Sequence, residues 1–130
     1  MRPMVRFRAQ GGHYAVPVED VRQVRTTDDL SLLPLGRVGV AGLVMHDDVA
    51  LPVLSVLGSG GNRLLVLEVE GRRFGLLVDE VSGVADVDER RLGPPPEGQS
   101  GTAITGVLES GQDIALVIDA GRLAQQVLDP

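Results

Sequence analysis

Short apolar runs alternate with turn residues along most of the chain, and we predict that these runs are strands. The runs span residues 4–9, 13–16, 38–45, 49–54, 64–69, 73–78, 103–108 and 113–118. Valine, leucine and isoleucine fill most of their apolar positions, and branched side chains favour strands. Short strands at regular spacing predict an all-β fold, either a barrel or a sandwich.

Pairs of residues that tolerate positive φ separate successive runs. The pairs are Gly11-Gly12, Asp47-Asp48, Glu70-Gly71 and Ser110-Gly111. Tight hairpins place such residues between their strands, so each pair predicts a β-hairpin. One helix is expected near the C-terminus, where Asp119 offers an N-cap and Leu123 and Val127 fall on one face.

The chain contains an internal repeat. Residues 13–24 read HYAVPVEDVRQV and residues 73–84 read RFGLLVDEVSGV, and the same offset of 60 extends before and after these segments. Each copy of such a repeat is expected to be one supersecondary unit. We therefore expect a single domain over residues 1–130 whose halves, approximately 4–56 and 64–118, superpose.

The spacing of apolar positions changes from two to three at the end of each copy. The positions are Val18, Val21 and Val24 in the first copy and Val78, Val81 and Val84 in the second. This spacing predicts a short helical turn in each half, with the acidic pairs Glu19-Asp20 and Asp79-Glu80 as its caps. We expect the first two valines of each copy to be mostly buried near the junction of the halves.

The composition excludes several classes of function. The 130 residues include no cysteine, which removes disulfides, thiol catalysis and thiolate metal sites. Twelve basic and 18 acidic residues give a formal charge of -6, which opposes the attraction to phosphate that dominates nucleic-acid affinity. No run approaches the roughly 18 apolar residues of a membrane helix. We expect a cytoplasmic protein without direct membrane insertion.

No residue pattern predicts a reaction centre. The chain has only two histidines and no G-x-S-x-G elbow. The glycines of residues 58–61 indicate a flexible connector, because the Lys-Ser/Thr ending of a phosphate-binding loop is missing. The pairs Arg72-Arg73 and Arg90-Arg91 are interpreted as solvated charge. We expect neither an enzyme nor a bound cofactor or metal.

One alternative of another class remains open. His46, Asp47 and Asp48 are three adjacent side chains of types that bind metals, so a small metal-dependent enzyme could use them as ligands. The simpler interpretation is a solvated hairpin tip, because adjacent residues point in different directions and no second cluster completes a coordination shell.

An ordered series of segments resembles the CheW family of chemotaxis coupling proteins. The segments are HYAVPVEDVRQV, LLPLGRVGVAGLV, LPVLSV, FGLLVDEVSGV, RLGPPP, ITGVL and LVIDAGRL, and the resemblance extends from Val5 to Leu123. It implies an all-β fold of two intertwined five-stranded SH3-like barrels with a short C-terminal helix. It also implies a non-enzymatic scaffold or adaptor of a bacterial chemosensory array, without a cofactor.

The resemblance implies two principal partners. One is the cytoplasmic tip of a chemoreceptor, a methyl-accepting chemotaxis protein, and the other is the regulatory domain of a CheA-type histidine kinase. Other CheW-like proteins are further candidates. The residues implied on the receptor side are Val21, Gln23, Asp47 and Val84.

The chain departs from the family at one of these positions. Family members usually read G-V-I-N-L-R-G before an I-P-V-x-D-L strand, whereas residues 42–48 read GLVMHDD, so that Asp47 takes the position of the arginine. Two versions of the function therefore stay open. One is a scaffold that links receptor to kinase. The other is a divergent CheW-like array component that binds one partner, receptor or kinase, without full kinase coupling.

Overall fold

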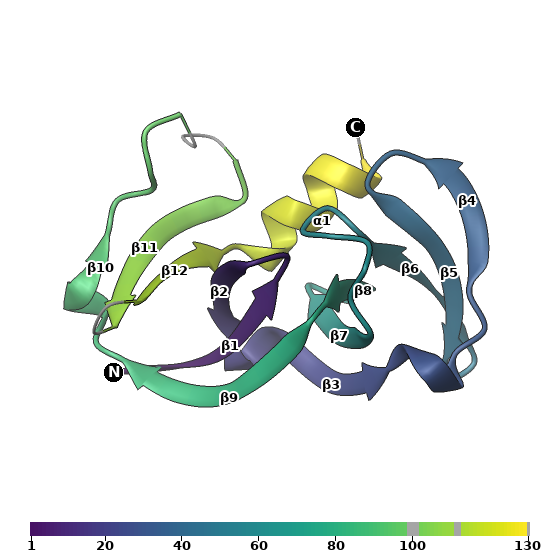
Figure 1. The fold of residues 1–130 in the computed structure, drawn as a ribbon, viewed down its shortest axis with the longest axis horizontal. Coiled ribbons are helices and arrows are strands. Elements are labelled where there is room, and N and C mark those ends of the chain that lie inside the picture. Colours follow the sequence, from purple (N-terminus) through teal and green to yellow (C-terminus); the bar gives the residue numbers. More distant parts are fainter. Residues whose placement is uncertain (99–101, 111–112, 130) are drawn as a thin grey trace.

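The computed structural model describes residues 1–98, 102–110 and 113–129, which form strands, short turns and one helix (Figure 1). The strands are β1 (Arg2–Ala9), β2 (Gly12–Pro17), β3 (Val21–Thr26), β4 (Leu33–Arg37), β5 (Val40–His46), β6 (Val49–Leu54), β7 (Arg63–Val69), β8 (Arg72–Val78), β9 (Glu80–Val87), β10 (Leu92–Gly93), β11 (Ile104–Ser110) and β12 (Asp113–Ile118). The 3-10 turns are η1 (Val18–Asp20), η2 (Thr27–Asp29) and η3 (Glu89–Arg91), and the helix is α1 (Ala120–Leu128). The expected all-β fold with a short C-terminal helix is confirmed.

The strands form two sheets that exchange their first hairpins (Figure 1). Sheet A has the order β10-β11-β12-β2-β1-β9, and sheet B has the order β3-β7-β8-β6-β5-β4. Each sheet therefore combines the first hairpin of one repeat with the four later strands of the other repeat. This exchange makes the two SH3-like barrels intertwined, and each described sheet has one strand more than the expected five.

The internal repeat is visible in the strand register. Sheet A pairs Phe7 with Val81 and has a bulge just after Val81 in β9, and sheet B pairs Leu67 with Val21 and has a bulge just after Val21 in β3. Phe7 and Leu67 differ by the offset of 60, as do Val81 and Val21. The same irregularity at the same place in both copies indicates that each repeat folds into the same set of strands.

The predicted helical turns are only partly correct. The first copy has the single turn η1, whereas the second copy continues directly into the strand β9. The apolar spacing of three between Val81 and Val84 arises because the pairing skips Ser82, since a bulge adds one residue to a strand with a period of two. Of the four valines expected to be mostly buried, only Val78 is fully buried. The other three are partly buried and pack against the core: Val18, Val21 and Val81.

The acidic pairs do not cap helical turns as expected. No side chain caps η1. In the second copy, Oδ2 of Asp79 accepts a hydrogen bond of 2.8 Å from the backbone N–H of Gln10, and Glu80 forms an ion pair with Arg8. These carboxylates therefore stabilise the contact between β9 and the β1–β2 hairpin. In the first copy, burial raises the pKa of Asp20, and the neighbouring Glu19 adds to this effect.

The hairpin turns mostly follow the sequence prediction. Asp47-Asp48 and Glu70-Gly71 have positive φ at both residues, as a two-residue type I′ hairpin requires. The first turn lies one residue earlier than predicted, at Gln10-Gly11, and Gly12 already begins β2. The fourth predicted turn includes Gly111, which lies outside the described residues.

Three groups of buried apolar side chains hold the fold together. The first joins both sheets to α1 and includes Phe7, Leu67, Phe74 and Leu123. The second lies inside sheet A, and the third lies inside sheet B. The expected N-cap of the helix is confirmed, since Oδ1 of Asp119 accepts a hydrogen bond of 3.0 Å from the backbone N–H of Arg122.

Candidate functional site

The hairpin between β5 and β6 presents two carboxylates to solvent. Asp47 and Asp48 form its turn with φ values of 50° and 64°. Aspartate tolerates this left-handed conformation better than most residues, which explains why the sequence places acids here. The side chain of Asp47 is 70% exposed, so its charge is available to a partner.

The side chain of His46, which precedes this turn, packs inside the barrel. Its side chain is buried, and its Nε2 lies 2.6 Å from Oε1 of Gln23 on β3. The amide oxygen of Gln23 only accepts hydrogen bonds, so Nε2 of His46 is the donor. Because β3 and β5 are not neighbours in sheet B, this hydrogen bond closes the barrel on that side.

Arg73 connects the turn to the rest of the sheet. Its Nη1 lies 3.5 Å from Nδ1 of His46 and 3.8 Å from Oδ2 of Asp47, and its Nε donates to Oε1 of Glu68 at 3.1 Å. The other oxygen of Glu68 accepts from Arg22 at 3.0 Å. The hydrogen bond from Arg73 is the main reason that the pKa of Glu68 is lowered, with a further contribution from Arg22. Opposite charges therefore alternate along this network.

The network reaches the carboxylate of Asp47 from two sides. The buried ring of His46 and the partly buried guanidinium of Arg73 both face its carboxylate, so the turn is held from two strands. Among the described residues, no three His, Cys, Asp or Glu side chains are grouped as metal ligands. The ring nitrogens of His46 face Gln23 on one side and Arg73 and Asp47 on the other.

The structure brings together two of the four residues implied on the receptor side. Gln23 and Asp47 lie on either side of His46, and each contacts its ring. Val21 begins β3 and is partly buried against the core. Val84 is 63% exposed on β9 in sheet A, whereas Asp47 follows β5 of sheet B.

Sequence reasoning missed the residues that support the turn. The prediction of solvated charge is wrong for Arg73, whose side chain is only 19% exposed and contacts Glu68 and His46. The prediction of solvated charge fits its neighbour Arg72 better. This arginine is about 41% exposed, and it pairs with Asp129 near the end of the chain. The alternation of faces along β8 separates these two adjacent arginines, and this could have been noticed from the predicted strand.

These features define a binding module built on two intertwined SH3-like barrels, in which an anchored hairpin tip offers charge to a partner. The model of the CheW-like domain matches residues 3–128, and the chain belongs to this family. The family consists of non-enzymatic coupling proteins with a scaffold or adaptor role, and this chain is not an enzyme.

Two known proteins illustrate the similarity. The chain is 26% identical over 105 residues to the chemotaxis protein CheW of Rhizobium meliloti (strain 1021). The aligned segment covers 74% of this chain and 68% of that protein. Its fold matches the crystal structure of the scaffolding protein TtCheW from Thermoanaerobacter tengcongensis with a TM-score of 0.78, at 22% identity, over 91% of this chain and 88% of that chain. In the part of the chain that the structure describes, no helix is long and apolar enough to span a membrane.

Proposed function

We propose that this protein is a scaffold of a bacterial chemosensory array that links the cytoplasmic tip of a chemoreceptor to the regulatory domain of a CheA-type histidine kinase. In this role residues 1–130 act as one unit in the cytoplasm, built from the repeats at approximately 4–56 and 64–118. Membership of the CheW-like family supports the proposal. The fold supports it as well, because two barrels on one chain offer two separate surfaces for two partners.

One observation carries the receptor side of the proposal. Asp47 is exposed at a hairpin tip, and His46 and Arg73 lie 3.6 and 3.8 Å from its carboxylate. A charge presented at a tight two-residue turn has a defined backbone position before binding, which favours its use in recognition. We assign Val21, Gln23, Asp47 and Val84 to the receptor-facing surface, with Asp47 as the residue that decides which receptor fits.

The charge of Asp47 also supports a second version of the function. A receptor surface matched to arginine presents acceptors, and a carboxylate cannot donate to them and repels them if they are charged. Such a mismatch commonly weakens binding by roughly ten- to a hundredfold. In this version the protein is a divergent array component that binds the kinase, or a receptor with a basic tip, without full kinase coupling.

A reconstituted array tests both versions. We expect this protein, combined with a standard receptor and CheA, to support weaker receptor-controlled autophosphorylation than a CheW protein that carries the arginine. The double substitution Asp47→Arg with Asp48→Gly should recover part of the activity, whereas Asp48→Gly alone should not. Binding to CheA without receptor is measured in parallel, so that a loss of folding or of kinase binding is recognised.

The outcomes separate the two versions. Full activation by the unmodified protein, together with a loss in the double variant, shows that Asp47 matches its own receptor and contradicts the divergent version. Absence of binding to both the receptor and CheA contradicts the scaffold function itself.

A further inference from the structure

The two barrels differ at one register position in their interiors. In sheet B, Val66 pairs with Gly75 and is fully buried among apolar side chains. In sheet A the equivalent residue is Arg6, which pairs with Ala15 and is only partly buried. The repeat therefore puts a guanidinium in one barrel at the position where the other barrel has a packed valine.

The barrels also differ in how their open side is closed. In sheet B, Val66 pairs with Gln23 on β3, and the side chain of Gln23 reaches His46 at the end of β5. In sheet A, Arg6 pairs with Gly83, which has no side chain to form such a bridge. The gap between β9 and β11 is therefore free of the hydrogen bond that closes the other barrel.

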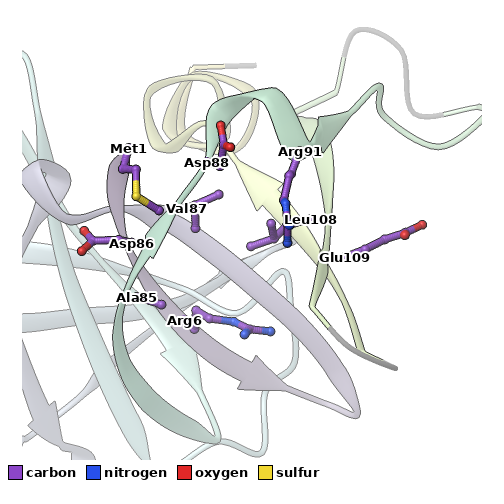
Figure 2. Close-up of a pocket in the computed structure, with 9 residues that line it drawn as sticks. All are labelled: Met1, Arg6, Ala85, Asp86, Val87, Asp88, Arg91, Leu108 and Glu109. Atoms are coloured by element: carbon purple, nitrogen blue, oxygen red, sulfur yellow. The ribbon is translucent and has the colours of Figure 1, made fainter.

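A cleft of about 430 Å³ lies at this gap, between β1, β9, η3 and β11 (Figure 2). The guanidinium groups of Arg6 and Arg91 are turned into it, and Leu108 also lines it. The carboxylates that border the cleft are turned away from it: those of Asp86, Asp88 and Glu109. The cleft thus has a cationic interior, an apolar wall and an acidic rim.

Neither arginine has a close polar partner among the described residues. Among residues 1–98, 102–110 and 113–129, the side chains of Arg6 and Arg91 form no hydrogen bond or ion pair. The nearby carboxylate of Asp88 is instead held by Arg90, whose Nε lies 3.2 Å from its Oδ1, and this hydrogen bond lowers the pKa of Asp88. Two guanidinium groups that face the same space repel each other, and an anion between them removes that repulsion.

We propose that this cleft binds an acidic side chain from a segment of a partner protein. Guanidinium groups form strong, directed hydrogen bonds with carboxylates, and two of them here face one space. The apolar wall of Val87 and Leu108 suits the aliphatic part of a glutamate. The acidic rim repels nucleic acids and anionic membranes, and it favours a lone acid with neutral or basic neighbours.

This docking site is separate from the receptor-facing surface. It lies on sheet A and uses Arg6 and Arg91, whereas Gln23 and Asp47 lie on sheet B. The test therefore uses neither receptor nor kinase, and its failure leaves the proposed scaffold function untouched.

The test is an NMR titration of the full chain labelled with ¹⁵N. The probe is the peptide acetyl-Lys-Gly-Glu-Gly-Lys-amide, and the matched control has glutamine in place of glutamate. We expect saturable shifts of the side-chain Nε–Hε signals of Arg6 and Arg91 and of the amide of Leu108 with the glutamate peptide only. Sodium glutarate, titrated at the same concentrations, tests a free small carboxylate as the ligand.

Three variants locate the binding. Arg6→Val installs the residue that the other barrel has at this position, so the fold is expected to remain intact, and the ¹⁵N spectrum checks it. Arg6→Val and Arg91→Gln should each lower the affinity for the glutamate peptide by roughly tenfold or more. Arg90→Gln, whose side chain pairs with Asp88, should leave the affinity unchanged.

Three results would overturn the proposal. In the first, the glutamine peptide shifts the same signals as strongly as the glutamate peptide. In the second, the affinity for the glutamate peptide survives in folded Arg6→Val. In the third, glutarate binds the cleft as tightly as the peptide, which assigns the site to a free small carboxylate instead of a protein segment.

Discussion

His46 and Gln23 join two strands that do not pair with each other: Nε2 of His46 lies 2.6 Å from Oε1 of Gln23, across the open side of sheet B. Since the histidine is only 3% exposed, His46→Ala removes this bridge and leaves a gap under the hairpin tip. We predict a loss of about 1–3 kcal/mol in the free energy of unfolding, measured by urea denaturation. Met45→Ala on the same strand changes an exposed side chain and should have little effect. Equal losses in the two variants would contradict the bridging role.

Gly42 is required by the backbone that leads to the same hairpin. It has a φ of 156°, and a Cβ at this position would lie 2.2 Å from the carbonyl oxygen of Leu33 on the neighbouring strand. Gly42→Ala should therefore cost about 2 kcal/mol or more. Gly36→Ala, which meets nothing within 4 Å, is the matched control and should be nearly neutral in the same denaturation measurement. A stable Gly42→Ala protein would mean that β4 and β5 are not paired in this way.

Val78 tests the strand assignment in the second repeat. It is 1% exposed within the core that joins the two sheets, so Val78→Asp buries a charge without a partner. The expected cost is several kcal/mol, enough to unfold the protein as seen by circular dichroism. Val84→Asp introduces the same charge at a position that is 63% exposed and should leave the fold intact. A thermal midpoint of Val78→Asp equal to that of the unmodified protein would disprove the assignment.

Asp20 and Glu68 should affect stability with opposite signs. Burial raises the pKa of Asp20 in the folded state, so its charged form opposes folding at neutral pH. Asp20→Asn should raise the thermal midpoint at pH 7, and the gain should disappear as the pH falls below the ordinary range of a carboxyl group.

Glu68 is the matched comparison for Asp20. Its pKa is lowered, chiefly by the hydrogen bond from Arg73, so its charged form favours folding above the ordinary carboxyl pKa. Glu68→Gln should lower the midpoint at pH 7, and this loss should fade as the pH falls through the lowered pKa. Differences that do not change between pH 7 and pH 3 would contradict both assignments.

The sequence predicts the local elements well because their signals are local. Alternating apolar residues and turn pairs identify the hairpins, and Asp119 identifies the start of α1. The strands β3 and β9 are missed because a bulge breaks their period of two, and the resulting spacing of three imitates a helical turn. The exchange of hairpins between the sheets depends on pairing between residues such as Phe7 and Val81, and no local pattern encodes such pairing.

The candidate site is predictable only in part for the same reason. The turn at Asp47-Asp48 follows from the residue types, and the family resemblance points to Gln23 and Asp47. The support from Arg73 and Glu68 arises because β7 and β8 lie between β3 and β6 in sheet B, which a reading along the chain does not show. The cleft at Arg6 becomes visible only when the two copies are compared at equivalent register positions.

The exchanged hairpins also determine when the chain can fold during its synthesis. The hairpin of β1 and β2 pairs with β9 up to Val87 on one side and with β12 up to Val117 on the other. Neither sheet is complete in the first half of the chain, because sheet B needs β7 and β8 and sheet A needs β9 to β12. The emerging N-terminal half exposes unpaired strand edges until those strands arrive, so we expect it to attract chaperones and other nascent chains.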